Sequence, residues 1–168
     1  MREMMVRNPP PDYRPCAGVM LFNRHGLIFA GRRRDIDLEV WQMPQGGIDV
    51  GETPRAAALR ELAEEAGTNK VEIVAQLEGW LTYEFPDELR NRVWGGRYAG
   101  QAQRWFLMRF TGEDSDIDIA ASEPSEFVTW QWMRLDELVH GIVAFKKSVY
   151  IYIAANFGAA IRNETCQK

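Results

Sequence analysis

The sequence predicts an α+β fold in which a mixed β-sheet lies between helices. Three observations predict it: short β-rich segments separated by turn residues, one strongly helical segment among them, and a second helical segment after them. A chain of 168 residues has the length of a single domain with its own core. We expect a flexible arm at 1–12, one domain at 13–160 and a short tail at 161–168.

The first predicted elements are two strands that flank a turn. Residues 17–22 are apolar and β-rich, residues 27–30 form the partner strand, and residues 23–26 have the composition of a turn. Residues 40–43 form a further short strand and lead into a glycine-rich loop, which can approach a ligand closely. The first part of the chain therefore predicts an antiparallel pair followed by a candidate binding loop.

Residues 54–66 form the clearest helix in the sequence. Thr53 is a good N-cap, and Pro54 suits the first helical position because its missing N–H needs no partner there. Gly67 can take the left-handed conformation that ends a helix. The expected apolar side of this helix consists of Leu59, Leu62, Ala63 and Ala66.

The second half of the chain predicts the remaining strands and two more helices. Strands are expected at 71–77, 80–85, 104–110 and 130–133, with loops at 86–100 and 112–125. A short helix is expected at about 135–141. From residue 145 onward apolar residues recur with helical periodicity, which predicts a long amphipathic helix that packs on the sheet.

Three glutamates on the helix at 54–66 indicate chemistry. Glu61, Glu64 and Glu65 are spaced i, i+3 and i+4, so they share one helix face and repel one another. Such a cluster is either solvated, as on an ordinary surface helix, or neutralised by a cation. Ligands that are all oxygen favour hard ions, Mg²⁺ first and Mn²⁺ second. The glycine-rich loop and Glu52 just before the helix favour the cation.

The same stretch resembles a family motif. Gly46 is followed after five residues by Glu52 and after seven more by Arg60-Glu61-Leu62-x-Glu64-Glu65-x-Gly67. This spacing resembles the Nudix box, and only Thr68 departs from it, where the family has a bulky aliphatic residue. The resemblance implies an α/β/α sandwich with the box as a loop-helix-loop, and hydrolysis of a diphosphate joined to another group. It also implies Mg²⁺ as cofactor, with Mn²⁺ or another divalent cation able to substitute.

The resemblance further assigns roles to the box residues. Glu61, Glu64 and Glu65 would hold the metal, with the backbone carbonyl of Gly46 as a further ligand. Arg60 would pair with Glu52 and orient the cluster. An additional carboxylate, as ligand or general base, is expected from the loop at 123–126; we expect Glu126, with Glu123 as the rival.

Segments outside the box resemble bacterial RNA pyrophosphohydrolases and the related dinucleoside polyphosphate hydrolases. The segments that carry this resemblance are Tyr13-Arg14-Pro15, Trp41-Gln42-x-Pro44-Gln45-Gly46-Gly47, Gln103-x-Trp105 and Phe145-Lys146-Lys147. By the resemblance, Arg14, Arg33, Gln101 and Lys146 would contact phosphates or nucleotide. Phe145 would stack on a base; the alternative is that it is the first core residue of the last helix.

These implications predict an enzyme that converts 5′-triphosphate RNA ends to 5′-monophosphate and so promotes mRNA decay. The alternative substrate is a dinucleoside polyphosphate such as diadenosine tetraphosphate, and the shared motifs leave this choice open. A non-catalytic nucleotide-binding module is a remote alternative, because such a module has no need to retain three mutually repelling carboxylates.

The composition indicates which binding partners and which cellular location to expect. A net charge of −4 argues against non-specific coating of nucleic acid, so we expect no DNA partner. No apolar run is long enough to span a membrane, and the N-terminal segment lacks the apolar core of a signal peptide. The cysteines, Cys16 and Cys166, have no metal-type spacing and are expected to be reduced thiols. We therefore expect a cytoplasmic protein; the sequence does not predict an oligomeric state.

Overall fold

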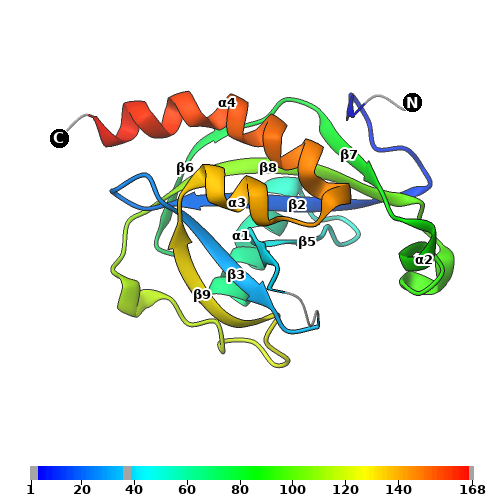
Figure 1. The fold of residues 1–168 in the computed structure, drawn as a ribbon, viewed down its shortest axis with the longest axis horizontal. Helices are drawn as coiled ribbons and strands as arrows, with labels where there is room; N and C mark the ends of the chain where they lie inside the picture. The colour runs from blue at the N-terminus through cyan, green and yellow to red at the C-terminus, as the bar shows by residue number, and fades with distance from the viewer. Residues whose placement is uncertain (1–3, 36–38, 167–168) are drawn as a thin grey trace.

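A mixed β-sheet with helices on both faces forms the fold (Figure 1), seen in a computed structural model that describes residues 4–35 and 39–166. The predicted α/β/α sandwich is confirmed. The strands are β1 (Met5–Val6), β2 (Tyr13–Phe22), β3 (Ile28–Arg33), β4 (Trp41–Gln42), β5 (Gln45–Gly47), β6 (Val71–Gln76), β7 (Trp80–Glu84), β8 (Gly100–Phe110) and β9 (Phe127–Met133). The helices are α1 (Pro54–Ala66), α2 (Asp87–Arg90), α3 (Leu135–Gly141) and α4 (Lys147–Thr165).

The parallel pair of β2 and β8 forms the centre of the sheet. Hydrogen-bonded neighbours follow the order β1-β7-β8-β2-β3-β4, while β5 pairs with β2, β6 with β8 and β9 with β3. Parallel pairing joins β2 to β8, and the other strand pairs are antiparallel. The register sets Arg14 opposite Gln101. Two polar residues that are far apart in the sequence thus become neighbours on the sheet.

Side chains alternate along β2 and divide the interior into two cores. Val19 and Leu21 belong to the core beneath α1, whereas Met20 and Phe22 belong to the core beneath α3 and α4. A strand that is covered on both faces has a nearly continuous apolar sequence, as β2 does. In Figure 1, α4 lies along the sheet on the opposite side from α1.

Helix α1 has the bounds that its sequence predicts. The Thr53 hydroxyl accepts a hydrogen bond from the Ala56 N–H at 3.2 Å, and Gly67 ends the helix with a φ of 66°. The expected apolar side is partly wrong, because Leu59 and Ala63 are exposed and Glu65 is buried instead. The sheet contacts turn the helix so that one carboxylate faces the interior. Its buried residues are Ala57, Ala58, Leu62, Glu65 and Ala66.

Thr68, the one departure from the Nudix box, is buried where the family has an aliphatic side chain. Its hydroxyl accepts a hydrogen bond from the Lys70 N–H at 3.2 Å, so the polar atom has a partner. The substitution is thus accommodated in the packing after α1.

Several elements extend beyond their predicted bounds. Strands β2, β8 and β9 begin earlier than expected, since their first residues find partners across the sheet. The loop expected at 86–100 contains α2 and a 3₁₀ turn at Trp94–Gly96. Short 3₁₀ turns also occur at Asp114–Asp116 and Ala144–Lys146.

Both expected terminal segments contribute structure in their described parts. Strand β1 lies in the expected arm at 1–12 and pairs with β7, and residues 1–3 lie outside the described residues. Helix α4 continues past residue 160 to Thr165, and residues 167–168 lie outside the described residues.

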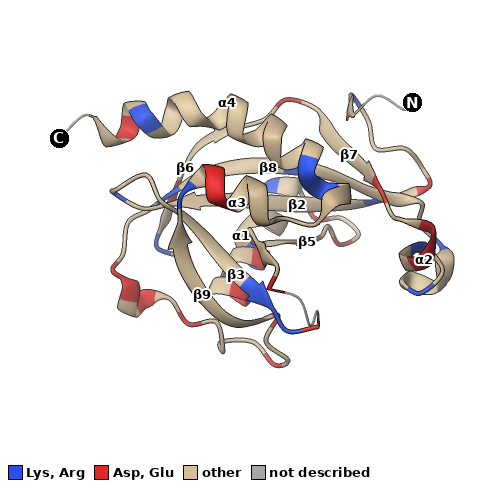
Figure 2. Cartoon of the chain, viewed as in Figure 1, with Lys and Arg blue, Asp and Glu red and all other residues tan. Residues whose placement is uncertain are grey.

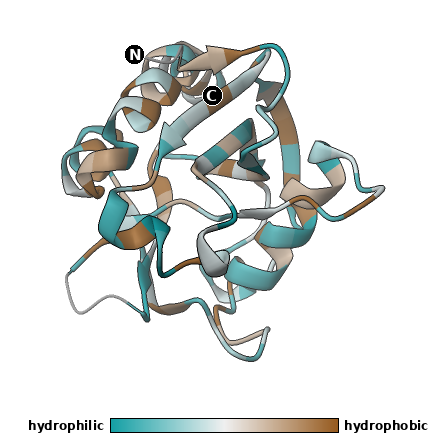
Figure 3. Ribbon diagram, turned by 90° about the vertical axis from the view of Figure 1, so that its right-hand side faces the viewer, coloured by the Kyte–Doolittle hydropathy of each residue, from teal (hydrophilic) through white to brown (hydrophobic). Residues whose placement is uncertain are grey.

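Polar and apolar residues are distributed as a layered fold requires. Figure 3 shows hydrophobic and hydrophilic residues interleaved along the helices and strands, and Figure 2 shows charges of both signs spread over the chain. Within the described part of the chain, no helix has the length and apolar character needed to cross a membrane. Both cysteines are free; Cys16 is buried and Cys166 is exposed.

Two leucines of α1 provide a test of the helix orientation. Leu62→Ala removes a fully buried side chain from the core beneath α1 and should lower the free energy of unfolding by about 2–5 kcal/mol. Leu59→Ala, on the exposed side of the same helix, should change it by less than about 1 kcal/mol. Urea denaturation measures both; equal losses would contradict this orientation.

Candidate active site

A cavity of about 660 Å³ gathers most of the residues expected to be functional. It lies where β2, β3, β5, α1, β7, β8 and the 3₁₀ turn before α4 meet. Its lining includes nine expected residues: Arg14, Arg33, Gly46, Glu61, Glu65, Gln101, Glu126, Phe145 and Lys146. The other three expected residues, Glu52, Arg60 and Glu64, are not part of this lining.

The Gly46–Gly47 pair lets a carboxylate and a guanidinium approach the same loop. A Cβ atom at Gly46 would overlap the Glu61 carboxylate, and one at Gly47 would overlap the Arg14 guanidinium. Both glycines belong to β5 and pair with β2, so their backbone is held in place. Only residues without a side chain let Glu61 and Arg14 lie this close to the backbone.

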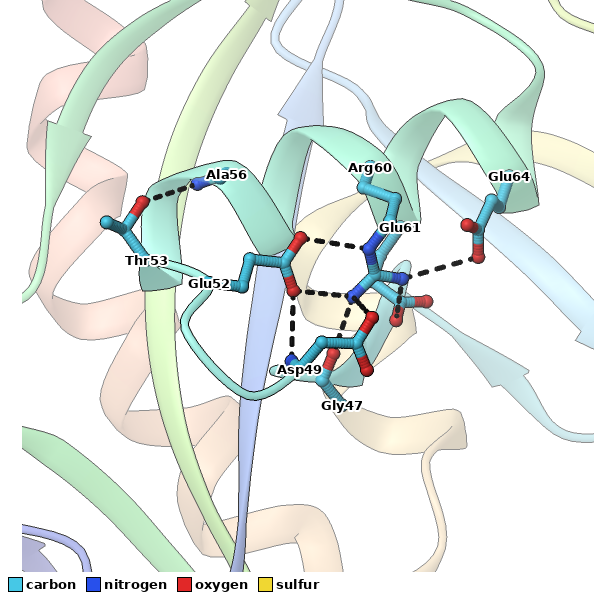
Figure 4. A network of polar contacts seen from close by, with 8 residues as sticks. All are labelled: Gly47, Asp49, Glu52, Thr53, Ala56, Arg60, Glu61 and Glu64. Carbon is cyan, nitrogen blue, oxygen red and sulfur yellow. Dashed lines mark hydrogen bonds and ion pairs between the residues drawn. The ribbon is translucent and has the colours of Figure 1, made fainter.

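Arg60 joins the loop to the helix through a network of charged hydrogen bonds (Figure 4). Its guanidinium donates to both Glu52 oxygens at 3.0 and 2.9 Å, to Glu61 at 2.8 Å and to the Gly47 carbonyl at 2.7 Å. The Arg60–Glu52 pair expected from the sequence is thus present. Hydrogen bonding from Arg60, and then from the Asp49 N–H, lowers the pKa of Glu52 to about 2. Arg60 is therefore occupied in orienting the box.

Two box carboxylates face the cavity in an unfavourable electrostatic environment. Burial raises the pKa of Glu65 well above its usual value, and the charges of Glu126 and Glu61 raise it further. Its carboxylate accepts one hydrogen bond, from the Gln45 N–H at 3.1 Å. Burial also raises the pKa of Glu61, despite its contact with Arg60. This accumulation of negative charge would be relieved by a cation.

The residue types at this end of the cavity suit a hard divalent cation, because the available ligands are carboxylate and carbonyl oxygens. In residues 4–35 and 39–166, no three side chains of His, Cys, Asp or Glu are grouped so that they could hold a metal as they lie. The position of Glu64 explains part of this. Its exposed carboxylate lies 3.5 Å from Arg60 and not in the cavity lining. The chemistry of these residues fits the metal.

Cations also line the cavity, near these carboxylates. The buried Lys146 ammonium donates to the Gln42 carbonyl at 3.2 Å, and Arg33 donates to the same oxygen at 3.4 Å. Arg33 also pairs with Asp35 at 2.5 Å and with Glu126 at 3.5 Å. Burial, together with the charge of Arg33, lowers the pKa of Lys146 to about 8. The Lys146 charge is thus sensitive to mildly alkaline pH.

Side-chain amides form a further part of the site. The Gln101 carbonyl accepts hydrogen bonds from the Tyr83 hydroxyl at 2.7 Å and from the Gln103 amide at 3.0 Å. Gln103 also donates to Gln45, which lines the cavity. Because two donors occupy the Gln101 oxygen, its NH₂ group is the part that can donate to an anion.

Phe145 lies where either role that the sequence leaves open is possible. Its ring is partly buried against the core beneath α3 and α4, and it also lines the cavity. The ring centroid lies 5.6 Å from that of Tyr83. One face of a core residue is therefore available at the cavity wall.

The sequence reasoning did not identify three aromatic residues of this wall: Tyr83, Phe85 and Trp94. Tyr83 and Phe85 read as ordinary strand residues, so no local signal distinguishes them. Trp94 did carry a signal, because a large aromatic residue stands beside Gly95–Gly96 in an otherwise polar segment. An apolar ring in such a loop is a common mark of a binding site.

Comparisons with known proteins find similar sequences over most of the chain. The NUDIX domain model matches residues 12–152. The RNA pyrophosphohydrolase of Roseobacter denitrificans is 54% identical over 149 residues, which cover 88% of this chain and 92% of that protein.

Solved structures share the fold at low identity. The E. coli dihydroneopterin triphosphate pyrophosphohydrolase aligns with a TM-score of 0.68 at 20% identity, over 86% of this chain and 98% of that one. A C. elegans Ap4A hydrolase binary complex aligns with a TM-score of 0.60 at 18% identity, with the same coverage.

Glu65→Gln tests the electrostatic stress at the cavity. The change keeps the size of the side chain and an acceptor for the Gln45 N–H, and it removes a buried charge. Because the folded-state pKa of Glu65 is raised, the wild-type protein loses stability as pH rises through that pKa. The variant should therefore melt at an equal or higher temperature without metal, with a difference that grows with pH.

Added Mg²⁺ supplies the second half of this test. Mg²⁺ should raise the melting temperature of the wild-type protein more than that of Glu65→Gln, because a ligand stabilises the state that binds it. Equal shifts in the two proteins would contradict a role for Glu65 in holding the metal.

Lys146 should make anion binding dependent on pH. As pH rises through about 8, its ammonium loses its proton, so ADP should bind more weakly at pH 9 than at about pH 7. Lys146→Arg keeps its charge over this range and should bind ADP with little change. Calorimetric titration at constant Mg²⁺ measures both; parallel pH profiles would exclude Lys146 as the titrating group.

Proposed function

This chain belongs to the NUDIX family, and from that premise we propose that it hydrolyses the 5′-triphosphate end of RNA. Water would attack phosphorus, a phosphoanhydride bond would break, and pyrophosphate or successive phosphates would leave. The RNA would retain a 5′-monophosphate, the change that promotes mRNA decay. The observation that carries the proposal is one cavity with carboxylates, cations and an aromatic wall.

Members of the family use divalent cations, and we propose Mg²⁺ here, with Mn²⁺ or another divalent cation able to substitute. When bound, the ion neutralises phosphate oxygens and lowers the pKa of a water molecule. The residues that would hold it are Glu61, Glu64, Glu65, Glu126 and the Gly46 carbonyl.

Glu126 is preferred to Glu123 as the additional carboxylate, either as a ligand or as the general base. Glu126 lines the cavity, and its charge raises the pKa of Glu65. Glu123 is exposed and is not part of the lining. The place of Glu126 in the cavity lining and its electrostatic effect on Glu65 thus support Glu126 over its rival.

The remaining cavity residues would recognise the substrate. Arg14, Arg33 and Lys146 supply positive charge for the phosphates, and the Gln101 amide supplies neutral donors. Phe145 would stack on a nucleobase, an interaction worth roughly 1–3 kcal/mol and tolerant of base identity. Among the described residues that line the cavity, none is a histidine or a cysteine, so recognition would rest on these cations, amides and rings.

Dinucleoside polyphosphates remain the second candidate substrate. They carry a polyphosphate chain between two nucleosides, and the same cavity groups would recognise the phosphates and a base. The printed name of the relative at 54% identity favours the RNA end. The full set of box carboxylates argues against a non-catalytic module, because their mutual repulsion serves no purpose without a cation. A cytoplasmic location, where mRNA is found, is part of this proposal.

A side-by-side rate comparison tests the proposal. A short triphosphorylated RNA should be cleaved with a kcat/KM at least about tenfold above that of ATP, because contacts beyond the first nucleotide add binding energy. The advantage should decrease as salt rises, since the phosphate contacts are ionic. EDTA should abolish phosphate release.

The same assay includes diadenosine tetraphosphate under identical salt and Mg²⁺. A kcat/KM for that compound above the RNA value would indicate that dinucleoside polyphosphates are the preferred substrates. Equal kcat/KM values for ATP and RNA would indicate a hydrolase that acts on nucleotides without preference for RNA.

A further inference from the structure

Arg14, one of the proposed phosphate contacts, lies between a tryptophan and a glycine. Its guanidinium carbon is 4.6 Å from the centroid of the Trp94 ring. The same guanidinium lies against Gly47, where a Cβ atom would overlap it. A cation over an aromatic face is attracted by the negative charge of the ring face. The position of Arg14 at the cavity therefore depends on β5 and on Trp94.

Trp94 is itself supported by other rings of the wall. Phe85 stacks on it with centroids 5.7 Å apart and planes at 26°, and Tyr98 meets it edge-on at 6.4 Å. Phe85 in turn contacts Tyr83 at 5.8 Å, and Tyr83 contacts Phe145. A continuous series of aromatic contacts thus runs from the proposed base platform to the cation that would meet the phosphates.

The backbone at Trp94 is unusual. Its φ of 45° lies in the left-handed region, which bulky side chains rarely adopt, and Gly95 and Gly96 follow with positive φ. Such a conformation persists where the surroundings hold it. Yet the side chain is 45% exposed, so burial of the ring alone does not account for it. This conformation places the ring in contact with Phe85 and Arg14.

We propose that Trp94 is a positioning residue that holds the Arg14 guanidinium ready for a substrate phosphate. This inference rests on the proposed function, in which Arg14 meets a phosphate. A free arginine side chain loses many rotamers when it binds an anion. Contact with Trp94 and Gly47 restricts Arg14 before the substrate arrives, so less entropy is lost on binding.

The competing role for Trp94 is direct stacking on a nucleobase. Phe85 stacks on the ring and Arg14 lies over it, so these two neighbours occupy ring surface that a stacked base would also use. The two roles differ in one respect that can be measured. A positioning residue acts only through Arg14, whereas a base platform acts without it.

The first experiment compares two replacements of Trp94 on triphosphorylated RNA. Trp94→Leu removes the aromatic face and keeps an apolar side chain, and Trp94→Phe restores an aromatic face. We expect Trp94→Leu to raise KM about two- to fivefold with a smaller change in kcat, and Trp94→Phe to stay close to the wild-type protein. A melting temperature for each variant separates these effects from loss of fold.

The second experiment repeats Trp94→Leu in an Arg14→Ala background. If Trp94 acts through Arg14, the second substitution should change kcat/KM by less than about 1.5-fold, since the interaction is already absent. Independent, multiplicative effects would overturn the positioning role and indicate direct contact with the substrate. Equal damage from Trp94→Leu and Trp94→Phe would also overturn it.

Failure of this inference is distinguishable from failure of the proposed function. If Arg14→Ala leaves kcat/KM for RNA unchanged, the phosphate contact itself is wrong. If Arg14→Ala lowers it and Trp94→Leu does not, only the positioning role is wrong.

Discussion

The arrangement of the site depends on one guanidinium. Arg60 bonds to a loop carbonyl, to Glu52 before the helix and to Glu61 on the helix, so a single cation ties β5 to α1. Without it, Glu61 would lose its ion pair, and its repulsion with Glu65 would be opposed only by cavity cations such as Arg14 and Lys146. Because Arg60 is engaged by Glu52, Glu61 and the Gly47 carbonyl, the buried Glu65 carboxylate remains on the cavity side. The protein thereby keeps its unfavourable electrostatics where a cation and phosphates would meet.

The central strand pair determines which residues surround that charge. Parallel pairing of β2 with β8 sets Arg14 beside Gln101, while β5 joins the other edge of β2 and carries the two glycines. The two cores hold these strands from both faces. The geometry of the site therefore depends on packing in the two cores. A change of register between β2 and β8 would move Arg14 relative to Gln101.

Features that depend on neighbouring residues could be predicted from the sequence. The bounds of α1 follow from Thr53, Pro54 and Gly67, whereas the Arg60–Glu52 pair was expected from the resemblance to a family motif. The side of α1 that is buried could not be predicted, because contacts with a distant sheet set the rotation that buries Glu65 and exposes Leu59. Tyr83 and Phe85 of the aromatic wall could not be predicted for the same reason, since only the folded sheet brings them to the cavity beside Phe145.

The two-residue strand β1 has a consequence for self-association. It pairs with β7, and the Thr82 N–H donates to the Met4 carbonyl at 2.7 Å. The Tyr152 hydroxyl of α4 reaches the Met5 sulfur at 3.2 Å, which ties the strand to the helix layer. An uncovered edge strand offers its backbone groups to strands of other chains and favours aggregation. By occupying part of the β7 edge, this short segment leaves fewer backbone groups of β7 open to strand addition by another chain.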